Sequence, residues 1–200
     1  ESRMSGRIHN KAVLILSGFL AARFGQDKPL SLSASVCFEQ SYSGIEGDSA
    51  SCAELIAILS SLSGIEVRQD LAVTGSINQR GQVQPIGGVT DKIHGWYEVC
   101  DQVGLTGRQG VVVPARNRDN LMLREDVIRA VEDDRFHVYA VESLEEALEI
   151  LTGAEAGEKQ PDGTYAEETV FGRCDRRLRQ MADVLKEYGP AAAQRNADSD

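Results

Sequence analysis

The segment 49–63, SASCAELIAILSSLS, constrains the fold more than any other part of the chain. Leu55, Leu59 and Leu62 recur at helical spacing, and most of the positions between them are small or apolar. Gly64 follows at a position where helices favour glycine as a stop. Because a helix that is apolar nearly all round must be covered by other elements, we predict that it forms the centre of one packed domain.

Hydrophobic periodicity predicts a mixture of helices and strands around this centre. Helices are expected over 8–24, 91–102, 120–133, 143–153 and 176–188, and strands over 30–38, 71–77, 81–86, 110–115 and 136–141. The strands 71–77 and 81–86 flank a glycine-containing turn and read as a hairpin, and Ser143 with Glu146 reads as a capping box. The order predicts an α+β fold of small mixed sheets with packed helices.

Composition limits the class of protein. The 200 residues are 42% hydrophobic but only 6% aromatic, which is typical of one domain with an aliphatic core. No apolar run approaches the ~20 residues of a membrane span, and the first residues lack a signal-peptide pattern. The net charge of −10 disfavours a nucleic-acid partner. We therefore expect a soluble, cytoplasmic chain with no membrane or nucleic-acid partner.

The four cysteines do not suggest a metal centre. Cys37, Cys52, Cys100 and Cys174 are far apart, and none belongs to a CxxC pair or a Cys/His cluster. We expect reduced, mostly buried thiols and no metal site.

A glycine-rich loop, GIEGDSAS, brings Ser49 to the start of the predicted central helix. The first N–H groups of a helix have no partner within it, so a nucleophile there would lie beside donors for a developing oxyanion. Gly47, Asp48 and Ala50 are the loop residues whose backbone would form this site. The simpler alternative is that Asp48 or Ser49 is only the N-cap of the helix, because both residue types are favoured there.

A serine hydroxyl needs a base to remove its proton, and the chain offers three histidines and a lysine as candidates. None of His9, His94 and His137 belongs to a recognisable triad motif, so we expect each to be structural. Lys92 shares a predicted helix face with apolar residues such as Trp96, where desolvation would lower its pKa from about 10.4 toward neutrality. The alternative for Lys92 is a solvated surface lysine.

Three blocks, GDSAS, AVTGSINQRGQVQPIGG and GGVTDK, resemble corresponding blocks of the Lon protease family in order and spacing. The likeness runs from about residue 5 to 152, the helix near 174–188 is similar to the end of the family's domain, and EGDSAS is similar to the LonB branch and its LonC-like relatives. The resemblance implies a Lon proteolytic domain, a fold like domain 2 of ribosomal protein S5, over 1–188. Residues 153–188 would be a C-terminal extension and helix, and 189–200 a disordered tail.

The resemblance also implies a chemistry, that of a serine endopeptidase with a Ser–Lys dyad. Ser49 would attack the peptide carbonyl, Lys92 would be its base, and Thr74 matches the threonine that hydrogen-bonds the lysine. A nearby carboxylate would raise the pKa of Lys92, so Glu46 and Asp48 beside the nucleophile work against a neutral base. Three alternatives are open for Glu46 and Asp48: their carboxylates point away from Lys92, they contact Lys92 only in an inactive arrangement, or they help to place the loop.

The resemblance further implies how the whole protein works. Its substrates would be unfolded or damaged polypeptides, its role protein quality control, and its assembly a homo-hexamer. The strands that normally open the family's domain, including a GxVxGLA-like stretch, are not found, so we expect them to lie outside this sequence. No GxxxxGK[ST] loop is present either, so ATP and Mg²⁺ are expected only if an AAA+ ATPase module lies upstream on the same full-length chain.

Two other functions compete with the peptidase. The first is a catalytically silent Lon-fold domain for assembly or substrate binding, against which the joint retention of Ser49, Lys92 and Thr74 argues. The second is a cysteine hydrolase that would use Cys52 or Cys100 with His94, although neither cysteine has an activating motif.

Overall fold

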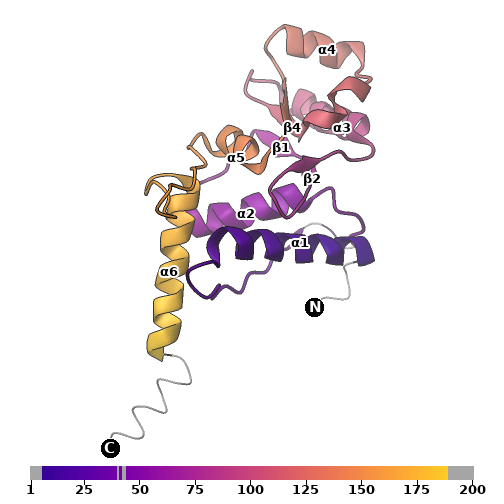
Figure 1. The fold of residues 1–200 in the computed structure, drawn as a ribbon. Coiled ribbons are helices and arrows are strands. Elements are labelled where there is room, and N and C mark those ends of the chain that lie inside the picture. The colour runs from indigo at the N-terminus through magenta and orange to yellow at the C-terminus, as the bar shows by residue number, and fades with distance from the viewer. Residues whose placement is uncertain (1–5, 40, 42–43, 189–200) are drawn as a thin grey trace, which may run out of the picture.

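The structure, a computed structural model, describes residues 6–39, 41 and 44–188 (Figure 1). The helices are α1 (Arg7–Phe24), α2 (Ser51–Ser63), α3 (Val89–Val103), the 3-10 helix η1 (Ala115–Asn120), α4 (Glu125–Glu132), α5 (Leu144–Thr152) and α6 (Val170–Tyr188). The strands are β1 (Leu71–Val73), β2 (Ser76–Ile77), β3 (Val83–Gln84), β4 (Gly110–Pro114) and β5 (His137–Val141). This mixture confirms the predicted α+β class. The predicted disordered tail, 189–200, lies outside the described residues.

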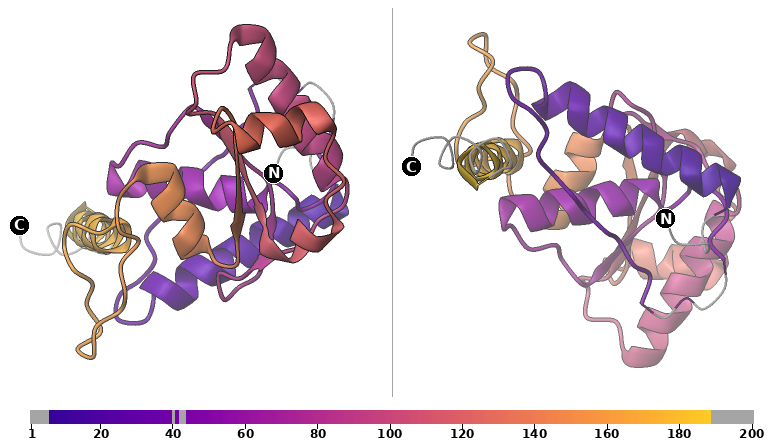
Figure 2. Two further views of the ribbon diagram at one scale, coloured as in Figure 1. Left: turned by 90° about the horizontal axis from the view of Figure 1, so that it is seen from above. Right: turned by 90° about the horizontal axis from the view of Figure 1, so that it is seen from below.

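Helix α2 is the central helix that its sequence predicts. Leu55 and Leu59 are completely buried, and Gly64 ends the helix in the left-handed conformation with φ of 68°. Helix α1 lies along α2, and α6 stands across one end of both (Figures 1 and 2). The thiol of Cys174 in α6 donates to the carbonyl of Leu59 at 3.4 Å, so the last helix packs directly against α2.

Two separate sheets lie beside these helices. Strands β1, β4 and β5 form a parallel sheet in the order β1-β4-β5, whereas β2 and β3 form an antiparallel hairpin. The prediction of one hairpin over 71–77 and 81–86 is therefore only partly right, because its first half divides into two strands. The division falls at Thr74 and Gly75, where the N–H of Thr74 still bonds Val112 of β4 but that of Gly75 bonds the carbonyl of Ser49.

The prediction of a strand over 30–38 is wrong. This segment is extended, but within the described part of the chain it belongs to neither sheet. Its alternation does bury one side in part, since Leu30 and Leu32 pack against the main core. A strand also needs a neighbouring backbone to bond with, and periodicity carries no information about that neighbour.

Strand β4 divides the hydrophobic interior into two clusters. Val112 belongs to the larger cluster around α1, α2, α5 and α6, whereas Val111 and Val113 face a second cluster built with α3 and α4. In the second cluster the rings of Tyr97 and Phe136 meet edge to face with centroids 5.3 Å apart. All five residues of β4 are buried, so this strand is covered on both faces.

Several helix boundaries differ from the predicted ones. Helix α4 begins at Glu125 rather than at 120, because 115–120 forms η1, and α6 begins at Val170 rather than at 176. Ser143 is the N-cap of α5, as predicted, and accepts a bond from the N–H of Glu146 at 3.2 Å. The Glu146 carboxylate, however, accepts from the N–H of Glu142 instead of closing a capping box on Ser143. None of the described helices is both long and apolar enough to cross a bilayer.

Candidate active site

Ser49 lies in the turn that enters α2, and neither it nor Asp48 caps the helix. Gly47 has a φ of 90°, which favours glycine, and the helix begins at Ser51 after Ala50, whose side chain makes no cap bond. The N–H and the hydroxyl of Ser51 both donate to the carbonyl of Asp48, at 3.0 and 2.7 Å. The Ser49 hydroxyl is therefore not occupied by the helix terminus.

The backbone of Ser49 is fixed by the chain between β1 and β2. Its carbonyl accepts from the N–H of Gly75 at 2.8 Å and from the hydroxyl of Thr74 at 3.3 Å. The N–H of Cys52 in turn donates to the carbonyl of Gly75 at 3.1 Å. These bonds hold the turn before α2 against the end of β1.

Lys92 reaches Ser49 from the first turn of α3. The preceding Gly88 has a φ of 66°, a left-handed conformation that turns the chain into this helix. The amine Nζ of Lys92 lies 2.9 Å from Oγ of Ser49 and 3.4 Å from Oγ1 of Thr74. The structure thus brings the two predicted dyad residues within hydrogen-bond distance, with Thr74 beside both.

The surroundings of Lys92 favour the neutral amine. Although the residue as a whole is exposed, partial burial lowers the pKa of Lys92 below its ordinary value. No carboxylate among the described residues forms an ion pair with Lys92 that would counteract this effect. A neutral lysine can accept a proton from a hydroxyl, and the 2.9 Å contact is the path for that transfer.

The two carboxylates next to the nucleophile bind other partners. Oδ2 of Asp48 accepts from the buried hydroxyl of Ser76 at 2.9 Å, and Oε1 of Glu46 accepts from the N–H of Ile8 at 3.3 Å. Of the three alternatives for Glu46 and Asp48, the geometry favours a role in placing the loop.

Sequence reasoning missed two serines that build this turn. Ser51 is 2% exposed, and its hydroxyl accepts from the N–H of Ile77, while Ser76 holds Asp48. The only available signal was a polar residue within each otherwise apolar segment, and its partner could not be read from the sequence.

The N-terminus of α2 offers backbone donors beside the hydroxyl of Ser49. Within the part of the chain that the structure describes, the N–H groups of Ser49 and Ala50 donate to no protein acceptor. Gly47 and Asp48 complete the turn on the other side of Ser49. Donors without partners are what an oxyanion needs. No three His, Cys, Asp or Glu side chains of the described residues gather in a way that could hold a metal ion.

Each of the three histidines contacts a group other than Ser49. His94 accepts from the N–H of Arg124 at 3.1 Å, a ring nitrogen of His137 lies 2.8 Å from the carbonyl oxygen of Gly107, and His9 faces Glu54.

The cysteines are unsuited to nucleophilic catalysis. Burial raises the pKa of Cys52 to about 12 and also raises that of Cys100, which disfavours the thiolate. Three of the four cysteines are buried, and only Cys37 is exposed. These environments argue against the cysteine-hydrolase alternative.

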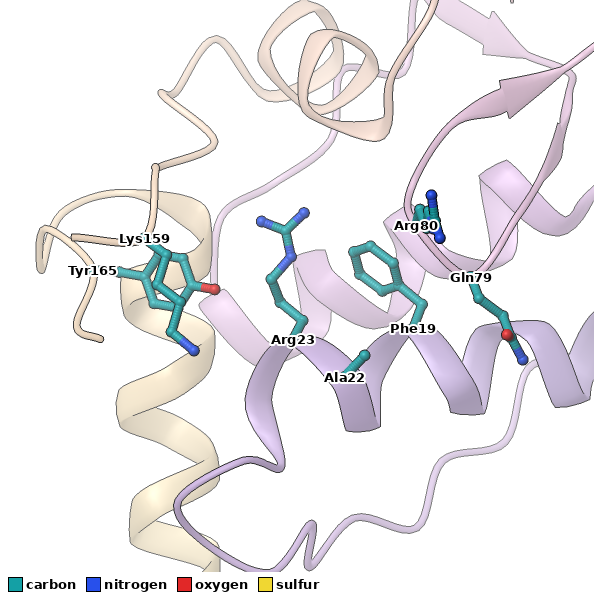
Figure 3. Close-up of a pocket in the computed structure, with 7 residues that line it drawn as sticks. All are labelled: Phe19, Ala22, Arg23, Gln79, Arg80, Lys159 and Tyr165. Atoms are coloured by element: carbon teal, nitrogen blue, oxygen red, sulfur yellow. The ribbon is translucent and has the colours of Figure 1, made fainter. Parts of the chain in front are cut away.

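A cavity of about 300 Å³ lies apart from these residues, over α1 (Figure 3). Its lining residues come from α1, from the turn between β2 and β3, and from the segment after α5: Phe19, Ala22, Arg23, Gln79, Arg80, Lys159 and Tyr165. None of the predicted site residues lines this cavity, so it is not the site of the chemistry described above.

Comparison with known proteins identifies the family that this chain resembles. Residues 41–153 match the family described as the Lon protease (S16) C-terminal proteolytic domain. A putative Lon protease homolog of Escherichia coli K12 is 42% identical over 151 residues, which cover 76% of this chain and 26% of that protein.

Two further relatives match nearly the whole chain. A putative Lon protease homolog of Haemophilus influenzae is 38% identical over 183 residues, covering 92% of this chain and 30% of that protein. The archaeal Lon protease of Thermococcus kodakarensis is 37% identical over 184 residues, covering 92% and 24%. The chain thus spans about a quarter to a third of the length of these relatives.

Proposed function

Because this chain belongs to the Lon protease family and carries its proteolytic domain, we propose that it is a serine endopeptidase with Ser49 as nucleophile and Lys92 as general base. The observation that carries the proposal is the 2.9 Å contact between Nζ of Lys92 and Oγ of Ser49. The lowered pKa of Lys92 supports it, because a base must be unprotonated to act.

Ser49, Lys92 and Thr74 each have a role in peptide hydrolysis. Oγ of Ser49 forms a bond to the carbonyl carbon of the substrate while its proton passes to Nζ of Lys92. N–H groups around Ser49 stabilise the oxyanion, and the Lys92 ammonium then protonates the leaving amine as the C–N bond breaks. Neutral Lys92 then takes a proton from water as the water oxygen attacks the ester carbon. Lys92 returns that proton to Oγ of Ser49 as the C–O bond breaks, which frees the carboxylic acid and regenerates the serine hydroxyl. Thr74 orients the amine through its hydroxyl.

The proposal extends to the protein of which this domain is part. We infer that its substrates are unfolded or damaged polypeptides, that it assembles as a homo-hexamer in the cytoplasm, and that ATP and Mg²⁺ act through an AAA+ module on the same full-length chain. For the domain itself we propose a fold related to domain 2 of ribosomal protein S5, with no metal, nucleic acid or membrane as a partner. The support is the family and the greater length of its relatives.

Cleavage of an unstructured, fluorescently labelled protein tests the dyad. We expect Ser49→Ala and Lys92→Ala to lower the rate by about a thousandfold or more, because each removes a member of one catalytic unit. Ser35→Ala, at an exposed position outside every element, should cleave like the wild type. A serine-directed boronate should inhibit the wild type.

If Ser49→Ala and Lys92→Ala cleave as fast as the wild type, the assignment of Ser49 and Lys92 as the dyad is wrong. A wild-type chain that binds the unstructured protein without cutting it would instead favour the silent, substrate-binding alternative.

A further inference from the structure

Helices α1 and α2 share a buried polar contact that the dyad chemistry does not use. Nε2 of His9, near the start of α1, lies 3.6 Å from Oε1 of Glu54, in the first turn of α2. Their side chains are only 12% and 5% exposed. Among the described residues, His9 is the only basic side chain that pairs with this carboxylate.

Stability does not explain this pair. Burial raises the pKa of Glu54, because it disfavours the ionised carboxylate, and His9 beside it opposes that effect. The groove next to the pair is lined with apolar side chains, including Leu16, Leu32 and Ile58. Well-packed hydrophobic residues in place of such a pair are often as stabilising or more so. The pair therefore needs an explanation other than the strength of the fold.

The location of the pair suggests that explanation. The N–H of Gly6 donates to the carbonyl of Ile45 at 2.8 Å, and the N–H of Ile8 donates to the Glu46 carboxylate at 3.3 Å. A Cβ atom at Gly6 would lie 1.4 Å from Oε2 of Glu46, so a side chain at this position would displace the Glu46 carboxylate. The start of α1 thus binds the chain just before Ser49 through residues 45 and 46, and just after it through Glu54.

Ser49 and Lys92 stand on different parts of the fold. Ser49 precedes α2, which packs on α1, whereas Lys92 belongs to α3, which packs on β4. The bonds of Thr74 and Gly75 hold one side of the Ser49 turn, and the contacts with α1 hold the other, so the distance between the two side chains depends on both. A shift of about 1 Å between reacting groups can lower a rate about a hundredfold.

We propose that His9 and Glu54 are positioning residues, which clamp the start of α1 to both sides of the nucleophile turn and so set Ser49 against Lys92. The proposal rests on the proposed peptidase function for its effect on catalysis. Its structural part, the placement of the turn, does not depend on that function.

A double substitution separates positioning from stability. In His9→Leu/Glu54→Leu we expect a melting temperature at or above that of the wild type, because the pair is replaced by apolar contacts. We expect the rate at which a fluorophosphonate labels Ser49, and kcat for cleavage, to fall about tenfold to a hundredfold while KM stays unchanged. Glu54→Gln, which keeps the shape of the side chain, should lose the same rate.

A second buried ion pair provides the matched control. Nζ of Lys28, in the loop after α1, pairs with Oδ1 of Asp175 in α6 at 2.5 Å, with side chains 7% and 16% exposed. Lys28→Leu/Asp175→Leu removes this pair, together with the contacts of Lys28 with Asp27 and of Asp175 with Arg179, at the far end of α1 from Ser49. We expect it to label Ser49 at the wild-type rate.

Hydrogen exchange of the full chain decides the structural part without any catalysis. In His9→Leu/Glu54→Leu the amides of Gly6 and Ile8, which donate to Ile45 and Glu46, should exchange at least about tenfold faster than in the wild type, and those of β4 at an unchanged rate. If the wild type labels Ser49 and the double variant labels it equally fast, the positioning proposal is wrong. If the wild type does not label at all, the proposed peptidase function fails. Unchanged exchange of the Gly6 and Ile8 amides would overturn the positioning proposal independently of that function.

Discussion

Ser49 and Lys92 come together through two local features of the backbone. The turn at Gly47 leaves the serine hydroxyl outside the helix cap, and the left-handed Gly88 begins α3 so that Lys92 falls in its first turn. Hydrogen bonds from Thr74 and Gly75 to the carbonyl of Ser49 then keep the serine next to the amine of Lys92. At the scale of single residues, the site depends on these few backbone conformations as much as on the two side chains.

The acid limb of the pH profile tests the protonation state of Lys92. Because burial lowers its pKa, the neutral base forms at a lower pH than in an ordinary lysine. We expect kcat/KM to rise with pH through a midpoint below about 10.4, the ordinary lysine value.

Lys92→Arg should lack this rise of kcat/KM with pH, because a guanidinium stays protonated. Its kcat/KM should be about a hundredfold to ten thousandfold lower than that of the wild type. A profile of the wild type that still rises only above pH 10.4 would contradict the assignment. Retained activity in Lys92→Arg would contradict it equally.

Thr74→Val tests how much Thr74 supports the dyad of Ser49 and Lys92. Valine keeps the shape of threonine but removes the hydroxyl, which contacts both the Lys92 amine and the Ser49 carbonyl. We expect kcat to fall about tenfold, the equivalent of one or two hydrogen bonds, as measured by peptide cleavage. Thr74→Ser should retain most of the activity, and an equal loss in both variants would point to packing rather than to the hydroxyl.

At the scale of elements, α5 is the helix whose start can be tested most directly. The hydroxyl of its N-cap, Ser143, accepts from the N–H of Glu146. We expect Ser143→Ala to lower the free energy of unfolding by about 1 kcal/mol, measured by urea denaturation. The exposed Ser35→Ala should change it by less than about 0.5 kcal/mol. An unchanged Ser143→Ala midpoint would mean that the Glu146 contact with Glu142 alone holds the start of the helix.

At the scale of the whole molecule, the two hydrophobic clusters are joined by β4, and the larger one is centred on α2. Leu59 is completely buried there, and its carbonyl also receives the thiol of Cys174 from α6. Leu59→Ala should therefore lower the free energy of unfolding by about 2–5 kcal/mol in the same urea measurement.

Val103→Ala, at a position that is 84% exposed, provides the comparison for this core change. We expect it to stay within about 0.5 kcal/mol of the wild type. Similar losses in both variants would mean that α2 is not the centre of the packed domain.

Local sequence was enough to predict the features that depend on neighbouring residues. The apolar pattern of α2, the stop at Gly64 and the cap at Ser143 follow from local sequence, because the side chains involved lie within a few residues of one another. The likeness of three sequence blocks also identified Ser49 and Lys92 as a pair, which the structure places within hydrogen-bond distance.

The features that depend on distant partners became visible in the folded molecule alone. Alternation predicted that Leu30 and Leu32 pack against the core, but not that Val36 is exposed or that 30–38 lies outside both sheets, and it could not separate β1 from the hairpin. The partners of Glu46 and Asp48, and the pairing of His9 with Glu54, were likewise invisible. Periodicity records which side chains avoid water, whereas the partner of a strand or a buried carboxylate is set by how remote elements pack together.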